Sequence, residues 1–159
     1  MTITNIELKA LFDKKLVLLT DIVMSNKLLN VSHKKTMNII INLDTKTDKG
    51  THWVALAIRD KEAFYYDSFG GKCDDYVVQF CKKYRLKLGI NTYIIQDLKS
   101  TQCGIFCFGY FLFLMKERIL KNVERLYPKS RLYELSNEYI NMYDPDTTKN
   151  DGILFNYIR

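Results

Sequence analysis

Apolar positions along the chain switch between helical and strand spacing, and this pattern predicts a mixed order of elements. Residues 4–15 place apolar side chains at intervals that suit a short helix. Residues 37–43 form a run of apolar and β-branched side chains, which predicts a strand, and residues 92–96 predict another. The polar residues 44–50 predict a turn. Residues 17–35 predict no element.

Two further runs rich in strand formers, 52–59 and 63–67, flank the charged segment 59–62, which suits a hairpin turn. Strands joined by so short a connection pair antiparallel. We therefore expect His52 and Asp67 to lie on adjacent strands of one sheet.

Three further segments predict helices. Residues 74–88 open with two carboxylates, which are favourable at the positive end of a helix, and Gly89 with Asn91 predicts the helix end. Residues 103–123 begin with a strongly apolar stretch and predict a long buried helix. Residues 132–143 are the third helical segment.

The C-terminal tail, residues 144–159, has polar turn residues followed by an apolar triplet at 153–155. This pattern suits either a strand that packs back or a contact with a partner. The order of elements as a whole predicts an α+β fold in which a central mixed sheet packs on the buried helix. At 159 residues, 47% of them hydrophobic, the chain can bury one ordinary core, so we expect a single domain over residues 1–159.

The N-terminal segment does not predict a secretory signal, because Lys9, Asp13 and Lys14 interrupt its apolar residues. The longest apolar stretch, residues 104–115, is shorter than the roughly 18 to 20 residues that span a bilayer. We therefore expect a soluble, monomeric protein that makes no membrane contact.

The four cysteines, at irregular spacing, do not suggest a disulfide framework, so we expect a reducing compartment. The chain has two histidines and no Cys-x-x-Cys pair, which argues against structural zinc. We expect that the chemistry requires no metal and no other cofactor.

Cys103 follows a polar loop and precedes Gly104 at the start of the predicted buried helix. Unpaired backbone N–H groups at a helix N-terminus favour anions, so this position suits a thiolate and the oxyanion on an attacked carbonyl. A thiol nucleophile also needs a base and a group that orients the base, which His52 and Asp67 can supply. The alternative for Cys103 is a buried core cysteine, the role that we expect of Cys107.

Each of these roles has a competitor. His33 is the other histidine, but the two lysines that follow it oppose formation of an imidazolium, so His52 is favoured as the base. The carboxylates that compete with Asp67 are Asp60, Glu62 and Asp74. Asp67 is favoured because the predicted hairpin places it opposite His52, whereas Asp60 lies in the turn.

The spacing of these residues resembles that of the adenain-like proteases and their relatives, the ubiquitin-like-protein-specific cysteine proteases. The matching positions lie within residues 50–115. They are Trp53 directly after His52, the acid in Asp67-Ser68-Phe69-Gly70, and Gln96 seven residues before Cys103-Gly104. Within that group, the chain is most similar to the adenovirus maturation type and to the compact versions carried by virophages and Maverick/Polinton-type elements.

The resemblance implies a cysteine protease fold whose catalytic cysteine begins the buried helix. The catalytic residues that it implies are the base His52, the orienting acid Asp67, the nucleophile Cys103 and the oxyanion donor Gln96. Gln102 is the alternative oxyanion donor. Trp53 would border a narrow substrate cleft that favours glycine near the cut, and Gly104 would let a substrate carbonyl approach closely.

By the same resemblance, the substrates would be capsid or other virion precursor proteins. The protein would then act in the virion, in the host-cell cytoplasm or at the site of virus assembly. The net charge of +6 is compatible with nonspecific DNA binding and with activation by DNA. Adenain-like proteases have Glu at the position of Asp67 and an activating peptide attached through a cysteine. No cysteine lies between Cys81 and Cys103, which argues against such a peptide here.

Three other functions remain open from the sequence. A deconjugating protease for a ubiquitin-like modifier and an acyltransferase would both use the same catalytic residues. A noncatalytic, basic DNA-binding or virion structural protein would use none of them.

Overall fold

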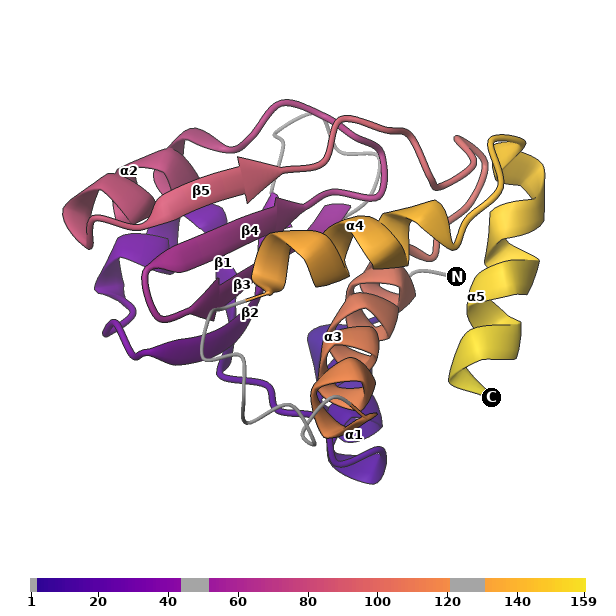
Figure 1. The fold of residues 1–159 in the computed structure, drawn as a ribbon, viewed down its shortest axis with the longest axis horizontal. Coiled ribbons are helices and arrows are strands. Elements are labelled where there is room, and N and C mark those ends of the chain that lie inside the picture. Colours follow the sequence, from indigo (N-terminus) through magenta and orange to yellow (C-terminus); the bar gives the residue numbers. More distant parts are fainter. Residues whose placement is uncertain (1–2, 44–51, 121–130) are drawn as a thin grey trace.

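The computed structural model describes residues 3–43, 52–120 and 131–159 (Figure 1). The turn predicted for residues 44–50 lies outside these ranges. So do the last residues of the helix predicted over 103–123.

A five-stranded sheet forms the centre of the fold, with its strands in the order β1-β2-β3-β4-β5 (Figure 1). The strands are β1 (Asp21–Met24), β2 (Thr36–Leu43), β3 (His52–Arg59), β4 (Glu62–Tyr66) and β5 (Lys87–Ile90). Strands β2, β3 and β4 pair antiparallel, while β1 runs parallel to β2 and β5 runs parallel to β4. The sheet is therefore mixed.

Helices cover both faces of this sheet (Figure 1). They are α1 (Asn5–Lys14), α2 (Asp75–Lys83), α3 (Cys103–Leu120), α4 (Leu132–Asn141) and α5 (Asn150–Ile158), with the 3-10 segments η1 (Ser25–Asn30) and η2 (Thr147–Lys149). Successive strand side chains point to opposite faces. In β2, Ile40 belongs to a cluster with α1, α3, α4 and α5, while Ile39 and Ile41 belong to a cluster with α2 and η1.

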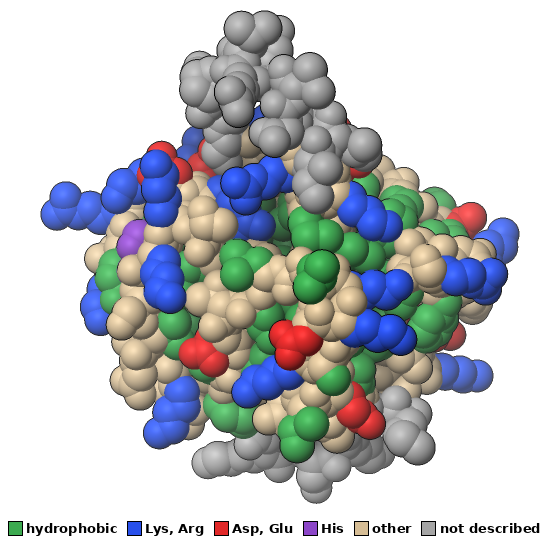
Figure 2. All heavy atoms as spheres, turned by 90° about the horizontal axis from the view of Figure 1, so that it is seen from below, with side chains coloured by type: hydrophobic (Ala, Val, Ile, Leu, Met, Phe, Trp, Pro, Cys, Tyr) green, Lys and Arg blue, Asp and Glu red, His purple; other side chains and the backbone are tan. Residues whose placement is uncertain are grey.

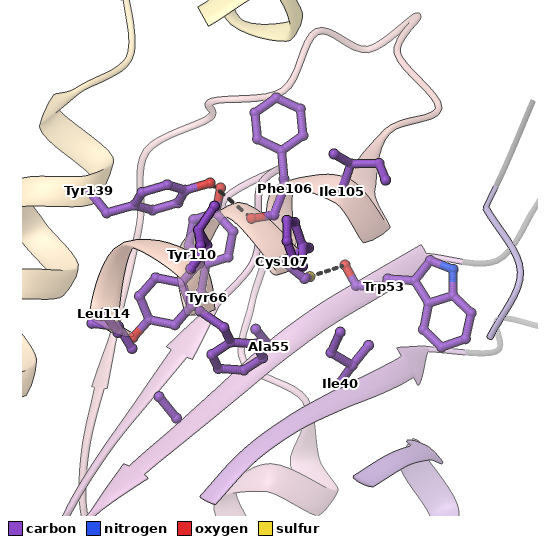
Figure 3. Packing of buried hydrophobic residues seen from close by; sticks show 14 of the residues in the cluster. Ile40, Trp53, Ala55, Tyr66, Ile105, Phe106, Cys107, Tyr110, Leu114 and Tyr139 are labelled. Atoms are coloured by element: carbon purple, nitrogen blue, oxygen red, sulfur yellow. Dashed lines mark hydrogen bonds between the residues drawn. The ribbon is translucent and has the colours of Figure 1, made fainter. Parts of the chain in front are cut away.

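Helix α3 lies against the sheet within the first of these clusters (Figure 3). Its aromatic residues Phe106, Phe108, Tyr110 and Phe111 are fully buried, so the helix is packed on more than one side. The hydroxyl of Tyr139 in α4 donates a hydrogen bond of 2.9 Å to the carbonyl oxygen of Phe106. Close packing of large side chains fixes the position of this helix and of the residue at its N-terminus.

Cys107 ties α3 to the sheet. Its thiol is fully buried and donates to the carbonyl oxygen of Trp53 in β3 over 3.5 Å (Figure 3). The packing role predicted for this cysteine is confirmed.

Most of the predicted elements are confirmed. They are the helix at 4–15, the strand at 37–43, the hairpin at 52–67, the helix that begins at Cys103 and the helix near 132–143. The turn of the hairpin holds Asp60 at a φ of 55°. The predicted α+β class, a mixed sheet packed on a buried helix with Cys103 as its first residue, is also confirmed.

The helix predicted over residues 74–88 was wrong at its C-terminal end. Helix α2 ends at Lys83, and residues 87–90 form β5. Arg85 adopts a φ of 56°, a left-handed conformation that does not continue a helix. Gly89 pairs with Phe64 of β4 instead of ending a helix, because pairing with a distant strand outweighs a local helical pattern.

The strand predicted at 92–96 does not form. The backbone N–H groups of Ile95 and Gln96 both donate to the carbonyl oxygen of Ser68, over 2.8 and 2.9 Å. Adjacent residues that share one acceptor cannot follow a strand ladder, in which successive groups point to opposite sides.

In the tail, residues 153–155 belong to α5, so a strand at this position was wrong. Leu154 packs into the cluster around α3 and accounts for the apolar triplet. Residues 17–35, for which the pattern predicted no element, contain β1 and η1.

Candidate active site

Three separate elements bring the predicted base, acid and nucleophile together. His52 is the first residue of β3, Asp67 directly follows β4, and Cys103 is the first residue of α3. Because β3 and β4 pair antiparallel, the start of one strand lies beside the end of the other. The hairpin therefore presents the imidazole and the carboxylate at the edge where α3 begins.

The imidazole of His52 is hydrogen-bonded to the carboxylate of Asp67. Nε2 of His52 lies 2.7 Å from Oδ1 of Asp67. The same oxygen accepts from the backbone N–H of Phe69 over 2.9 Å, and Oδ2 accepts from the backbone N–H of Gly71 over 3.2 Å. Asp67 is almost fully buried, at 3% exposure, so these contacts hold the carboxylate in one orientation.

Asn91 holds the backbone of Asp67 and is a site residue that the sequence did not reveal. Its Oδ1 accepts from the Asp67 N–H over 2.8 Å, and its Nδ2 donates to the Asp67 carbonyl oxygen over 2.7 Å. The amide thus replaces a missing partner strand beyond the end of β4. The only sequence signal was an Asn directly after an apolar segment, which we interpreted as a helix end.

The turn after Asp67 depends on Gly70. This residue has a φ of 62°, and an added Cβ would lie 2.7 Å from the carbonyl oxygen of Tyr93. Both facts restrict the position to glycine. The turn also brings the ring of Phe69 against that of His52, with 4.9 Å between the ring centroids. Phe69 thereby shields the base from water on one side.

Cys103 lies in the first turn of α3 and is nearly buried, at 4% exposure. Its Sγ accepts from the backbone N–H of Trp53 over 3.4 Å. The adjacent residue, His52, therefore approaches the thiol from the start of β3.

The protonation of His52 reflects both neighbours. Burial by itself would lower the pKa of His52, but the hydrogen bond to Asp67 and the charges of Asp67 and Cys103 outweigh burial and raise the pKa to about 9. Nδ1, the ring nitrogen that does not face Asp67, is buried with no partner in hydrogen-bond geometry. The cluster therefore favours an imidazolium between a carboxylate and a thiol at neutral pH.

The other histidine and the other cysteines lie in different surroundings. His33 stacks on Tyr84 near the end of α2, with 4.7 Å between ring centroids. Burial raises the pKa of the Cys73 thiol to about 12 and that of the Cys81 thiol to about 11. Burial also raises the pKa of the Cys107 thiol. Among the cysteines of the described residues, Cys103 is the one that contributes to the raised pKa of His52.

The carboxylates that competed with Asp67 also have other surroundings. Asp60 lies in the hairpin turn, and Glu62 begins β4 at the opposite end from Asp67. Asp74 caps α2 by accepting from the backbone N–H of Tyr76 over 3.1 Å.

Gln96, the predicted oxyanion donor, is fully buried and held on both sides. Its Oε1 accepts from Ser68 Oγ over 2.5 Å, and its Nε2 donates to the carbonyl oxygen of Ser100 over 3.0 Å. The carbonyl can only accept, which fixes the orientation of the amide. Gln102, the alternative, donates its backbone N–H to Ser100 Oγ over 3.2 Å. The role of Gln96 stays a prediction.

Trp53 and Gly104, the predicted substrate-binding residues, lie next to one another. A Cβ on Gly104 would come within 2.5 Å of Ile3 Cγ2 and 3.3 Å of Trp53 Cδ1, so the missing side chain makes room for packing. A pocket of ≈ 440 Å³ beside Trp53 is lined by the start of α1, by β1 and by Asn42. Contact of either residue with a substrate stays a prediction.

Residues 3–43, 52–120 and 131–159 contain no group of three or more His, Cys, Asp or Glu side chains placed to hold a metal ion. Over the same ranges, no helix has both the length and the apolar character that crossing a membrane requires.

The geometry defines a class of site, a thiol–imidazole–carboxylate cluster with the thiol at a helix N-terminus. No protein-family model matches the chain, and no curated protein is significantly similar to it. The architecture fits the arrangement that the sequence resemblance implied.

Several solved structures have similar backbones. The selenomethionine form of the ASFV pS273R protease has a TM-score of 0.48 and 18% identity, over 80% of this chain and 44% of that chain. A second structure of the ASFV pS273R protease has a TM-score of 0.47 and 17% identity, over 80% of this chain and 43% of that chain. AvrA delL154 with IP6 and CoA has a TM-score of 0.43 and 14% identity, over 73% of this chain and 48% of that chain.

The chain thus spans less than half the length of each of these proteins. Likenesses this distant do not establish an activity, so the function has to be inferred from the site.

Proposed function

We propose that this protein is a cysteine endopeptidase that hydrolyses peptide bonds through a covalent thioester. The observation that carries the proposal is the His52 imidazole, bound to Asp67 over 2.7 Å, with a pKa raised to about 9 by Asp67 and Cys103. A protonated base beside a thiol at a helix N-terminus is the arrangement that prepares a thiolate nucleophile.

In the first step, the Cys103 sulfur attacks the scissile carbonyl carbon and forms a C–S bond. The carbonyl oxygen becomes an oxyanion, which needs preorganised donors. The donors in this proposal are the Cys103 backbone N–H, in the first turn of α3, and the Gln96 side-chain amide. In support of a preorganised amide, Ser68 and Ser100 hold Gln96 in place; its Nε2 donates to Ser100 in this structure and would turn one N–H to the oxyanion when substrate binds.

In the second step, His52 gives its proton to the leaving amine as the C–N bond breaks, which leaves a thioester on Cys103. Neutral His52 then takes a proton from water, the hydroxide adds to the thioester, and the C–S bond breaks to release the acid. Asp67 keeps the imidazole in the orientation and tautomer that both transfers require.

The proposed substrates are capsid or other virion precursors, cleaved near glycine during virus maturation. This part depends on the sequence resemblance to adenain-like proteases. A deconjugating protease would have the same site, so the substrate has to be identified by experiment. A panel of virion precursors and ubiquitin-like modifiers, each containing a Gly-Gly sequence, separates the two functions.

DNA as an activator is a further proposal, supported by the net charge of +6. Figure 2 shows Lys and Arg side chains spread over one face among apolar, neutral and acidic side chains. Such a distribution suits nonspecific contact with phosphates and not the recognition of a sequence. Cleavage rates with and without DNA, at low and high salt, measure the effect.

The test of the endopeptidase is Cys103→Ala, with Cys73→Ala as the matched control. Cys73 is also a free thiol, but it lies beside α2. We expect Cys103→Ala to abolish cleavage of a Gly-Gly precursor while the unfolding midpoint changes little, and Cys73→Ala to retain cleavage. Undiminished cleavage by Cys103→Ala would rule out the mechanism.

A further inference from the structure

A chain of side-chain hydrogen bonds links the C-terminal helix to the loop that carries Gln96. We call this loop, residues 91–102 between β5 and α3, the Gln96 loop. Ser100 Oγ donates to Asp151 Oδ1 over 2.9 Å, and Gln96 Nε2 donates to Ser100 Oγ over 3.2 Å. Asp151 lies in the first turn of α5, 51 residues after Ser100.

The hydroxyl of Ser100 is fully used in this arrangement. A serine hydroxyl has one proton to donate and two lone pairs that accept. Here the lone pairs accept from Gln96 Nε2 and from the backbone N–H of Gln102, each over 3.2 Å. The proton goes to Asp151. An ionised carboxylate can only accept, so Asp151 fixes the direction of the O–H bond and thereby the directions of both lone pairs.

Both groups that Ser100 holds are close to the proposed chemistry. Gln96 is the proposed oxyanion donor, and Gln102 directly precedes Cys103. The Gln102 carbonyl oxygen also accepts from the backbone N–H of Phe106 over 2.9 Å and so closes the first turn of α3. Oxyanion donors are effective only when they are held in place before the charge develops. The orientation of the Ser100 hydroxyl therefore matters for catalysis.

Asn150, the residue before Asp151, holds the other side of Gln96. It is fully buried, and its Nδ2 donates to the carbonyl oxygen of Ile95 over 2.7 Å. The first two residues of α5 thus contact the Gln96 loop on either side of Gln96. Neither contact involves the residues proposed to touch the substrate.

We propose that Asp151 is a positioning residue of the active site, which acts through Ser100 on the Gln96 amide. This inference rests on the proposed endopeptidase function. Helix α5 would then do more than pack against α3, because it supplies the carboxylate that orients Ser100 in the Gln96 loop.

The test compares Asp151→Ala with Asp151→Asn, which keeps an acceptor oxygen. Asp146→Ala is the matched control, since it removes the same charge nearby from a side chain that accepts from Thr148 and not from the Gln96 loop. Hydrolysis is followed with a fluorogenic Gly-Gly aminomethylcoumarin peptide. Alkylation of Cys103 by iodoacetamide is followed by mass spectrometry, because alkylation forms no oxyanion and reports on the thiolate alone.

We expect Asp151→Ala to lower kcat about tenfold, a fraction of the roughly 10²–10³-fold that loss of an oxyanion donor costs. KM and the alkylation rate should stay unchanged. Asp151→Asn should recover most of the kcat, and Asp146→Ala should match the unaltered protein. An unchanged kcat in Asp151→Ala, or an equal fall in hydrolysis and alkylation, would overturn the inference.

A double-mutant cycle separates positioning from general stabilisation. In a Gln96→Ala background, Asp151→Ala should cost little further kcat, because the group that it positions is already gone. A full additional tenfold loss would again overturn the inference. If the unaltered protein cleaves no peptide although Cys103 is alkylated, the endopeptidase proposal fails, and this inference falls with it.

Discussion

The candidate site has two halves that are built in different ways: the hairpin half, with His52 and Asp67, and the loop half, which is the Gln96 loop. His52 and Asp67 lie 15 residues apart, on or next to strands that pair through a backbone ladder. The Gln96 loop has no ladder, and its contacts reach Ser68, Asp151 and Asn150 across 28, 51 and 55 residues. Strand pairing brings the base to its acid, whereas hydrogen bonds to distant segments position the proposed oxyanion donor.

Burial separates the two halves in the same way. In β3, residues 53–58 are buried on both faces of the sheet, so the hairpin is stabilised by hydrophobic packing. On the Gln96 loop, Tyr93, Ile94 and Leu98 are exposed. The loop therefore depends on its polar network, in which each bond matters more because few others replace it. A change in the hairpin half should abolish catalysis, and a change in the loop half should reduce it.

Among the changes that test this difference, Asp67→Asn in the hairpin half should have the largest effect on kcat. The substitution removes the charge that holds the His52 imidazolium, and we expect kcat to fall by about 10³–10⁴-fold. The control is Asp74→Asn, which changes a helix cap outside the site. Steady-state hydrolysis of the Gly-Gly peptide measures both, and a loss under tenfold in Asp67→Asn would contradict the role of this carboxylate.

The same variant should change how stability depends on pH. The pKa of folded His52, about 9, lies above its ordinary value of 6.5, so binding of the proton stabilises the fold. This contribution is complete below pH 6.5 and is lost as pH rises through about 9. Urea unfolding between pH 6 and pH 10 should therefore show the unaltered protein losing stability over this window. Asp67→Asn should show a smaller loss, because Cys103 still raises the pKa of His52, and parallel curves would contradict the role of Asp67 in that pKa.

The sequence predicted the hairpin half because its information is local. Two runs of strand formers and a charged turn determine β3 and β4, and pairing then brings His52 to Asp67. Likewise, an apolar run after a polar loop determines where α3 begins, and with it the position of Cys103. These patterns depend on neighbours in the chain, so they can be predicted without knowing which distant segments are in contact.

The loop half could not be predicted because its information is not local. The pattern at 92–96 favours a strand, yet both N–H groups of Ile95 and Gln96 turn to Ser68. The tail forms a helix whose first residues bind the loop, although its apolar triplet also suits a strand. Strand β5 appears where a helix was predicted because β4 offers an unpaired edge. Each outcome depends on a partner far away in the sequence.

A smaller effect should come from Asn91→Ala, at the junction of the two halves. The change leaves the N–H of Asp67 buried without its partner, while the C=O of Asp67 keeps its bond to the backbone N–H of Gly70, so it should cost about 1–3 kcal/mol of unfolding free energy. The control is Asn156→Ala on the exposed side of α5. Urea unfolding measures both. If Asn91→Ala costs no more than the control, the amide does not hold the acid.

The smallest effect should come from Gly152→Ala in α5, which tests whether the loop half gains from a firmer tail. Nothing lies within 4 Å of an added Cβ, so the methyl group meets no obstacle. Alanine restricts the unfolded chain more than glycine does and should stabilise the protein by about 0.5–1 kcal/mol. Because the Ser100–Asp151 bond is already formed, kcat should not change. If kcat rises together with stability, separation of α5 from the Gln96 loop limits catalysis in the unaltered protein.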